Sequence, residues 1–351
     1  MESHARVVVI GGGVVGCSIL YHLAKFGWKD VVLLERKELT SGSSWHAAGM
    51  IHTVNADSNI ARLQGYTINL YKEIEELSGQ SCGIHRPGGL YLASTPERLD
   101  YLKQERAKAR YMGLETDFIS LKEAHELNPL IDPAKYLGAL FEPVDGHVDP
   151  AGVTHAYAKA ARVLGAKVYR ETPVIETKPR PNGSWDVVTP TGTIRAGIVV
   201  NAAGLWAREV GRLAGIDLPV QPMEHHYLIT EEIPELRAHG KEAAVTVDYE
   251  GNAYTRQEHF GMVLGTYETN CVPWAVSGTP LNFGHELLQD DLSRVSERLE
   301  TAFERMPALG RAGIKKVING PFTFGPDGNP LIGPVPGLKN YWTAVGVMAG
   351  F

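Results

Sequence analysis

The feature that most constrains the fold is a glycine-rich turn placed between a strand and a helix near the start of the chain. Residues 6–10 read RVVVI, a continuous β-branched run typical of a strand buried on both faces of a parallel sheet. The sequence GGGVVG follows at 11–16, and apolar periodicity then predicts a helix over 14–26 and a second strand over 31–35. This order is a βαβ unit, which predicts an α/β fold.

The glycines match the G-x-G-x-x-G pattern of dinucleotide-binding turns. Gly11 permits the tight turn, Gly13 lets the backbone approach a pyrophosphate, and Gly16 lets the helix pack closely on the strand. Glu35 ends the second strand 19 residues beyond Gly16 (35 − 16 = 19), where a carboxylate accepts hydrogen bonds from a ribose. Because an acidic residue disfavours a 2′-phosphate, we expect FAD or NAD rather than NADP.

Two later stretches favour FAD over NAD. VVNAAGLWA (199–207) is a strand that reaches a turn of small residues, and FTFGPDGNPLIGP (322–334) contains glycines and prolines that force a tight loop. Repeated close approach of the backbone suits a long ligand such as FAD. A nicotinamide-dependent dehydrogenase stays open as an alternative, and it predicts a colourless protein.

The length of 351 residues predicts about two domains. Alternating strands between 220 and 264 (HHYLIT, AYTR, GMVLGTY) predict an antiparallel sheet, whereas helices and short strands alternate before them. We therefore expect an α/β (α+β) fold in which a Rossmann-like FAD-binding domain is interleaved with an antiparallel-sheet substrate domain. The FAD-binding domain is expected at 1–80, about 145–215 and 320–351, and the substrate domain at about 81–144 and 216–319.

Composition restricts the classes of binding partner and the cellular compartment that we expect. The 34 Lys and Arg against 40 Asp and Glu give a net charge of −6, which argues against nucleic acid. Cys17, Cys82 and Cys271 are too far apart for a disulfide framework, which favours a reducing compartment. No apolar run approaches membrane-spanning length and no signal or transit pattern is present, so we expect no membrane partner and a cytoplasmic location.

The segment SGSSWHAAG (41–49) resembles the flavin-attachment motif of the dimethylglycine and sarcosine dehydrogenase family, flavoproteins of the D-amino-acid-oxidase-like fold. In that family the histidine of W-H-A-A-G is bonded to the flavin 8α-methyl group, and the matching residue is His46. The resemblance runs through ETPVIE (171–176) and the two stretches above to AVGVMAGF at the end of the chain. With the fingerprint, it implies that FAD is held by Gly11, Gly13, Val14, Val15, Gly16, Glu35, Arg36, Ser43, Ser44, Trp45, His46, Ala48, Gly49, Val174, Ala203, Gly204, Trp206, Gly325, Gly346 and Val347.

The resemblance also implies an activity. It is the oxidation of an N-methyl amine such as dimethylglycine by hydride transfer to flavin N5, giving an iminium and then a demethylated amine plus formaldehyde or a one-carbon unit. The electron acceptor would be oxygen or an electron-transfer flavoprotein.

PMEHHYLIT and NAYTRQE resemble the family's substrate-side strands, which implies His225 and Tyr254 as catalytic residues. By the period of two, His226 points to the opposite face of the sheet, so only one of the two histidines can line the pocket; His225 is the better match and His226 stays open as the alternative. His225 is expected to have a near-neutral pKa suited to assisting loss of the amine proton, and Arg256 is a candidate for binding a substrate carboxylate.

Two alternatives stay open. One is a sarcosine, 4-methylaminobutyrate or D-amino-acid enzyme of the same fold. The other is a non-catalytic fragment of a larger flavoenzyme, because the folate-binding module of the family is absent and the family's flavin module continues past Phe351. We therefore expect a C-terminally truncated FAD module. No metal site is expected, since His147 and Asp149 have no further ligand at a metal-site spacing, and Asp149 is expected to cap a helix that begins at Pro150.

Overall fold

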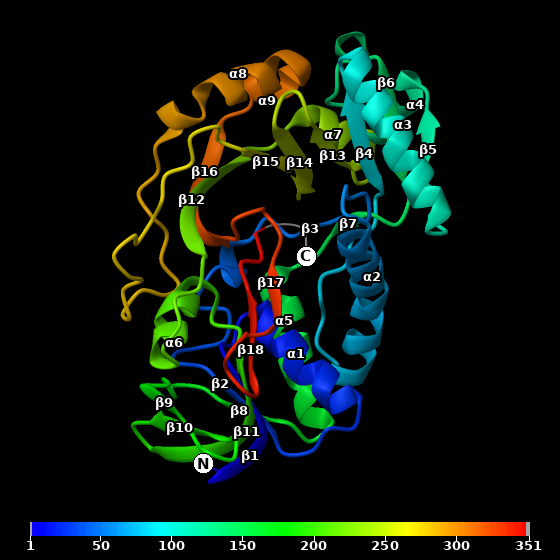
Figure 1. The fold of residues 1–351 in the computed structure, drawn as a ribbon. Helices are drawn as coiled ribbons and strands as arrows, with labels where there is room; N and C mark the ends of the chain where they lie inside the picture. Colours follow the sequence, from blue (N-terminus) through cyan, green and yellow to red (C-terminus); the bar gives the residue numbers. More distant parts are fainter. Residues whose placement is uncertain (1, 349–351) are drawn as a thin grey trace.

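The computed structural model describes residues 2–348, so the last three positions of the expected FAD-binding domain, 349–351, lie outside the described residues. Two eight-stranded sheets organise the chain (Figure 1). The first contains β1 (His4–Ile10), β2 (Val31–Leu34), β8 (Lys167–Tyr169), β9 (Glu176–Pro179), β10 (Trp185–Thr189), β11 (Gly192–Asn201), β17 (Leu331–Pro334) and β18 (Tyr341–Val345). Its order is β17-β18-β11-β1-β2-β8, with β10 and β9 attached beside β11. The central strands β18, β11, β1, β2 and β8 pair in parallel, as the N-terminal βαβ unit predicts.

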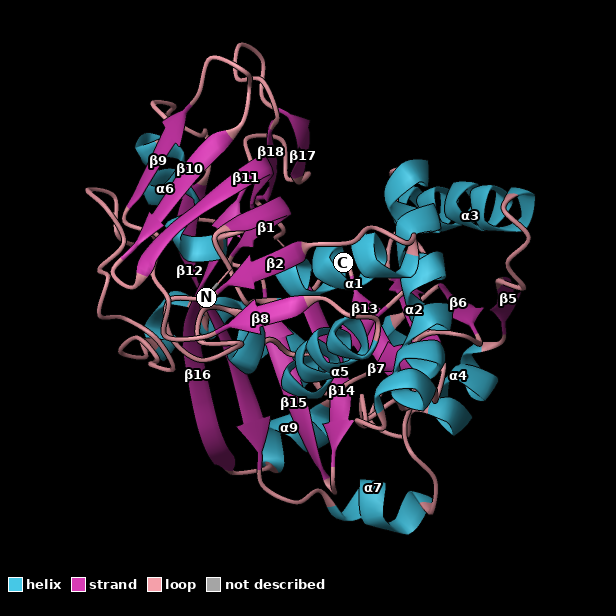
Figure 2. Ribbon diagram, turned by 90° about the horizontal axis from the view of Figure 1, so that it is seen from below, coloured by secondary structure: helices cyan, strands magenta, loops and turns pink. Residues whose placement is uncertain are grey.

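The first sheet is buried on both faces. Val7 and Val9 of β1 pack in the core with α1 (Val14–Lys25), α2 (Ser58–Ser78) and α5 (Pro150–Val163), which lie on one side of the sheet (Figure 2). Val8 and Ile10 point the other way, into a core that includes Trp185 and the helix α6 (Ala207–Leu213). The continuous apolar run of β1 is therefore explained by two cores, one on each face.

The second sheet has the order β16-β12-β15-β14-β13-β4-β6-β5. Its strands are β4 (Gly89–Ala93), β5 (Asp117–Ile119), β6 (Gly138–Glu142), β12 (Gln221–Thr230), β13 (Val245–Asp248), β14 (Ala253–Glu258), β15 (Gly261–Thr266) and β16 (Ile314–Phe324). Every pair is antiparallel except β13 and β4, which run parallel. The interleaved fold class is confirmed, with that one parallel pair as a difference, and the expected boundary at residue 320 falls inside β16.

One face of the second sheet is covered by short helices and the other faces the first sheet. Leu90, Leu228 and Leu264 pack in a core with α4 (Leu121–Leu127), α7 (Pro234–His239), α8 (Ser296–Arg305) and α9 (Pro307–Arg311). The helix α3 (Pro96–Tyr111) packs beside β4 and β6. The side chains that alternate with these leucines along each strand point to the other face, toward the space between the two sheets.

Short elements complete the chain. The two-stranded pair β3 (Met50–Ile51) and β7 (Gly146–His147) lies between the sheets, and the single-turn helices are η1 (Ser44–His46), η2 (Pro133–Lys135), η3 (Gly204–Trp206) and η4 (Leu292–Arg294). Asp149 caps α5 by accepting a hydrogen bond from the Ala151 amide, which confirms the predicted helix start at Pro150. Within residues 2–348, every helix is too short or too polar to cross a membrane.

Candidate functional site

A cavity of about 640 Å³ extends from the glycine-rich turn to the second sheet. Its wall includes the predicted residues Gly11, Gly13, Val14, Val15, Glu35, Ser43, Ser44, His46, Ala48, Gly49, Ala203, Gly204, Trp206, His225, Tyr254, Gly346 and Val347. The structure thus brings together segments from the start, the middle and the end of the described chain in one elongated space, which suits a dinucleotide with a substrate at one end.

The glycine-rich turn has the geometry that dinucleotide binding requires. Gly11 has φ +117°, and a Cβ there would come 2.4 Å from the Ala202 carbonyl oxygen. A Cβ on Gly16 would lie 1.9 Å from the Gly11 carbonyl oxygen, so only glycine allows α1 to approach β1 this closely. Gly13 lines the cavity at the N-terminus of α1, where amide groups favour a pyrophosphate.

Glu35 is held at the end of β2 by the backbone around it. Its carboxylate accepts hydrogen bonds from the Gly12 amide at 2.6 Å and from the Lys37 amide at 2.8 Å. Burial raises the pKa of Glu35 despite these two bonds. Because each carboxylate oxygen has two acceptor positions, capacity is left for ribose hydroxyls on the cavity side.

His46 ends the single turn η1 and is buried at the cavity wall. Its Nε2 atom is buried without a hydrogen-bond partner, and burial lowers the pKa of the imidazole to about 4. The ring faces the Cα of Gly320, where a Cβ would come 2.4 Å from Nδ1. His46 is therefore a neutral imidazole with an unpartnered nitrogen in the cavity region.

His225 and Tyr254 come from β12 and β14 and meet in the cavity. Nε2 of His225 lies 3.2 Å from the Tyr254 hydroxyl. Burial lowers the pKa of His225 to about 3, with smaller contributions from His226 and His46, and burial raises the pKa of Tyr254 well above its usual value. The near-neutral pKa expected for His225 is not what the structure gives, because the enclosed aromatic surroundings disfavour the imidazolium.

His226 and Arg256 lie elsewhere. His226 points to the opposite face of β12, where it hydrogen-bonds to Glu268 at 3.0 Å and accepts from the Asp291 amide. Arg256 does not line the cavity: its guanidinium donates to the Ala48 carbonyl at 2.5 Å and pairs with Glu258. Arg256 therefore hydrogen-bonds to the loop that follows His46, and its charge is paired with Glu258 rather than available to a substrate.

The remaining predicted cofactor residues do not line the cavity, namely Gly16, Arg36, Trp45, Val174 and Gly325. The Arg36 guanidinium stacks 3.6 Å from the centre of the Trp206 ring and donates to the Leu281 carbonyl, so it supports a wall residue. The Trp45 ring packs edge-on against His46, and Val174 packs in the core behind the first sheet. Arg36 and Trp45 therefore contact wall residues from outside the cavity.

Sequence reasoning missed most of the aromatic wall, which includes Tyr91, Tyr227, Tyr249, Tyr267 and Phe322. Each lies on or beside a strand of the second sheet, and an alternating strand pattern with one aromatic face is the signal that marks them. Tyr91 donates to the buried carboxyl of Asp145, which also accepts from the Thr53 amide at 2.9 Å. Burial raises the pKa of Asp145 to about 8, so a carboxyl group that holds its proton near neutral pH stands behind the cavity wall.

The fold and the site together define a dinucleotide-binding oxidoreductase. The chain belongs to the FAD dependent oxidoreductase (DAO) family, whose model matches residues 6–351. It is 45% identical to the mitochondrial dimethylglycine dehydrogenase of Rattus norvegicus over 98% of this chain and 41% of that protein. It is 36% identical to the mitochondrial sarcosine dehydrogenase of Homo sapiens over 99% of this chain and 38% of that protein. The chain therefore spans about two-fifths of the length of these relatives.

Among solved structures, the fold is similar to that of L-proline dehydrogenase from P. horikoshii. The TM-score is 0.85 and the sequence identity 28%, over 99% of this chain and 89% of that one. The expected family resemblance and the flavoprotein fold are thus confirmed, and FAD rather than NAD is the cofactor of the family.

Proposed function

We propose that this protein oxidises an N-methyl amine of the dimethylglycine type, with FAD attached through His46. The observation that carries the proposal is the meeting of a neutral, unpartnered His46 with the His225–Tyr254 pair at one aromatic-walled end of the cavity. The relatives named for dimethylglycine and sarcosine support the same substrate class. When bound, FAD supplies the electron-accepting ring that takes up a hydride from the substrate.

His46 meets the chemical requirements for attachment. A neutral imidazole nitrogen with a free lone pair would be the nucleophile toward the 8α-methyl carbon, which would lose one hydrogen as a proton to solvent and leave the electron pair of that C–H bond on the flavin ring. The low pKa keeps the imidazole lone pair free at neutral pH. Ala47 and Ala48, which follow His46 along the cavity wall, have small side chains that leave the ring edge accessible. Since Nε2 has no partner in the described structure, attachment costs no existing hydrogen bond.

The cavity wall favours an uncharged amine. Tyrosine rings dominate the substrate end, and the carboxylate of Asp248, which also lines the wall, is already paired with Arg305. Burial in such a space disfavours an ammonium, so the amine releases its proton to solvent as it enters and keeps the lone pair that oxidation requires. Tyr254, which stays protonated, can donate its hydrogen bond to the neutral His225 or to a carboxylate oxygen of the substrate, which leaves the lone pair of the amine free. The pair positions the amine rather than storing its proton.

With Arg256 engaged elsewhere, neutral donors bind a substrate carboxylate. Asn252 and the tyrosine hydroxyls are the neutral donors that the wall offers. The oxidised substrate is an iminium, and water converts it to the demethylated amine and formaldehyde. In a longer protein the one-carbon unit passes to a further acceptor.

The test is anaerobic mixing of the purified yellow chain with dimethylglycine, sarcosine and glycine in turn. We expect loss of the flavin absorbance with dimethylglycine or sarcosine and much slower loss with glycine, which has no N-methyl group. Admission of air then shows whether oxygen is an acceptor. Unchanged absorbance with every N-methyl amine, in a chain that carries a full complement of FAD, contradicts the proposed activity.

The attachment is tested separately by acid precipitation. Yellow colour in the pellet, on the peptide that contains His46, is the expected result for the unmodified chain. The His46→Ala chain is expected to bind FAD that acid releases into the supernatant. A His46→Ala chain that keeps its colour in the pellet contradicts the assignment of the linking residue.

A further inference from the structure

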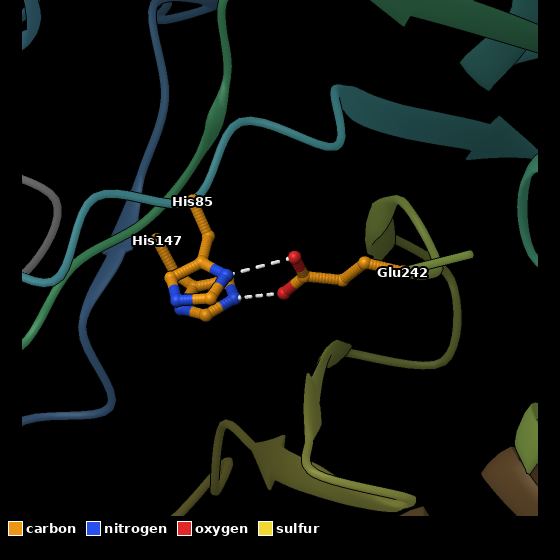
Figure 3. Close-up of side chains that lie close together, drawn as sticks. All are labelled: His85, His147 and Glu242. Carbon is orange, nitrogen blue, oxygen red and sulfur yellow. Dashed lines mark hydrogen bonds and ion pairs between the residues drawn. The ribbon is translucent and has the colours of Figure 1, made fainter.

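We propose that His85, His147 and Glu242 form a binding site for one divalent transition-metal ion of the zinc class, outside the flavin cavity. Nδ1 of His85 lies 2.8 Å from one oxygen of Glu242, and Nε2 of His147 lies 2.5 Å from the other. Figure 3 shows both rings directed at the single carboxylate. The three candidate ligand atoms lie within 4.8 Å of one another.

The backbone places the two histidines side by side. His85 and His147 exchange two backbone hydrogen bonds of 2.9 Å across an isolated antiparallel bridge. Their rings stack with centres 4.7 Å apart and planes within 9° of parallel. Gly146 allows this close approach, because a Cβ there would come 1.9 Å from the His85 carbonyl oxygen. The pair is therefore built by the fold rather than by freely rotating surface side chains.

Glu242 reaches the pair from a different part of the chain. It lies in the loop between α7 and β13, so its spacing from His147 in the sequence gives no sign of a shared site. The earlier expectation that His147 has no further ligand residues rested on sequence spacing alone, and the tertiary structure brings two to it.

The donor set suits a zinc-class ion. Two imidazole nitrogens and one carboxylate oxygen are the three protein ligands of many zinc sites, in which water takes the fourth position. His147 has a side chain 10% exposed, whereas that of His85 is 52% exposed. An ion can therefore enter from the His85 side and leave one coordination position toward solvent. Calcium and magnesium do not suit the site, because they require mostly oxygen ligands.

The site lies between two segments that also form the cavity wall, so a bound ion would affect the stability of the fold. His147 pairs with Met50 in the short β3–β7 ladder, next to the cavity wall at Gly49. Glu242 precedes β13, whose Val247 also lines the cavity. A bound ion would join these two wall segments, so metal binding should raise the thermal stability of the chain.

The test is equilibrium dialysis of the flavin-loaded chain against Zn²⁺. We expect one tightly bound ion per chain and a rise in Tm on its addition. His147→Ala, His85→Gln and Glu242→Gln should each weaken binding by at least about tenfold, since even supporting groups around metal ligands typically contribute that much. His155→Gln, which alters an exposed histidine of α5, is the matched control and should bind as the unmodified chain does. Circular dichroism establishes that each variant is folded.

A second readout examines coordination directly. Co²⁺ bound to two imidazoles and a carboxylate in tetrahedral geometry gives intense visible absorption bands, which should be present in the unmodified chain and in His155→Gln and absent in folded Glu242→Gln. Zn²⁺ affinity that is equal in the unmodified chain and in all three folded ligand variants overturns the proposal. The cluster is then a hydrogen-bonded contact between two histidines and a glutamate.

Discussion

The imidazole of His46 lies against the Cα of Gly320, so close that a Cβ on Gly320 would come 2.4 Å from both Nδ1 and Cε1 of the ring. Gly320 of β16 is also the register partner of His225 in β12. One glycine thus allows the residue proposed to hold the cofactor to sit beside the residue proposed to position the substrate. No other residue type at 320 leaves room for this arrangement.

Replacing Gly320 tests that relationship. Gly320→Ala is expected to push the His46 ring out of position, to abolish acid-stable flavin, and to destabilise the chain by about 1–3 kcal/mol through overpacking. Acid precipitation and urea unfolding measure the two effects. Gly65→Ala is the control, because a Cβ at that helical position meets no atom within 4 Å. Full covalent loading of Gly320→Ala would show that the His46 position is not restricted in this way.

Alanine substitutions at two glycines of the fingerprint, Gly16 and Gly13, are expected to have different effects on FAD content and Tm. In Gly16→Ala the new Cβ would lie 1.9 Å from the Gly11 carbonyl oxygen, so α1 must move and both FAD content and Tm should fall. In Gly13→Ala the new Cβ meets only Ser44 Oγ at 3.3 Å and faces the cavity, so FAD content should fall with little change in the Tm of the flavin-free chain. Equal loss of Tm in both variants would contradict this division of roles.

The hydroxyl of Tyr254 is expected to matter for catalysis more than for folding. Tyr254→Phe removes the hydroxyl that contacts His225 Nε2 in the cavity and should slow anaerobic flavin reduction about tenfold, which corresponds to about 1.4 kcal/mol in the activation barrier. Tyr21→Phe is the matched control, since that hydroxyl donates to Glu73 at 2.5 Å and lies outside the cavity wall. Equal reduction rates in the two variants would remove Tyr254 from the proposed mechanism.

Buried neutral histidines make the folded chain sensitive to acid. Unfolded histidine binds a proton near pH 6.5, whereas in the fold His46 does so near pH 4 and His225 near pH 3. The unfolded chain therefore binds more protons below pH 6.5, and each group lowers the free energy of unfolding by about 1.4 kcal/mol per pH unit as the pH falls through that window. His225→Gln should reduce the stability difference between pH 7 and pH 5, measured by urea unfolding. An unchanged difference would mean that the pKa of His225 in the fold is close to its value in the unfolded chain.

Asp145 should have the opposite dependence. Its pKa is raised by burial to about 8, so the folded chain keeps a proton that the unfolded chain has already lost, and stability falls as the pH rises from about 4 to 8. Asp145→Asn replaces the protonated carboxyl with a neutral group of the same shape. This variant should lose less stability than the unmodified chain between pH 6.5 and pH 8. An equal loss in the two chains would show that Asp145 is already ionised in the fold.

Local patterns predicted much of the fold. The β-branched run before the glycines, the helix starts at Val14 and Pro150, and the alternating strands after residue 220 all appear where the sequence placed them. The period of two also predicted that His225 and His226 lie on opposite faces of one strand, and the structure places His225 on the cavity side and His226 against Glu268. These features depend on neighbours in the chain and on alternation along a strand, so a single sequence contains them.

Which distant groups meet, and how deeply they are buried, depends on the packing of the whole chain. The low pKa of His225 arises from enclosure between strands, Arg256 is taken by the Ala48 carbonyl and Glu258, and the two ligand partners of His147 come from separate loops. Spacing in the sequence carries no signal for these facts, because the electrostatic energy of a group depends on desolvation and on neighbours across the fold. Local sequence alone predicted the nucleotide-binding unit, the family motif and the candidate histidines His46 and His225, whereas burial in the fold makes both of these imidazoles neutral.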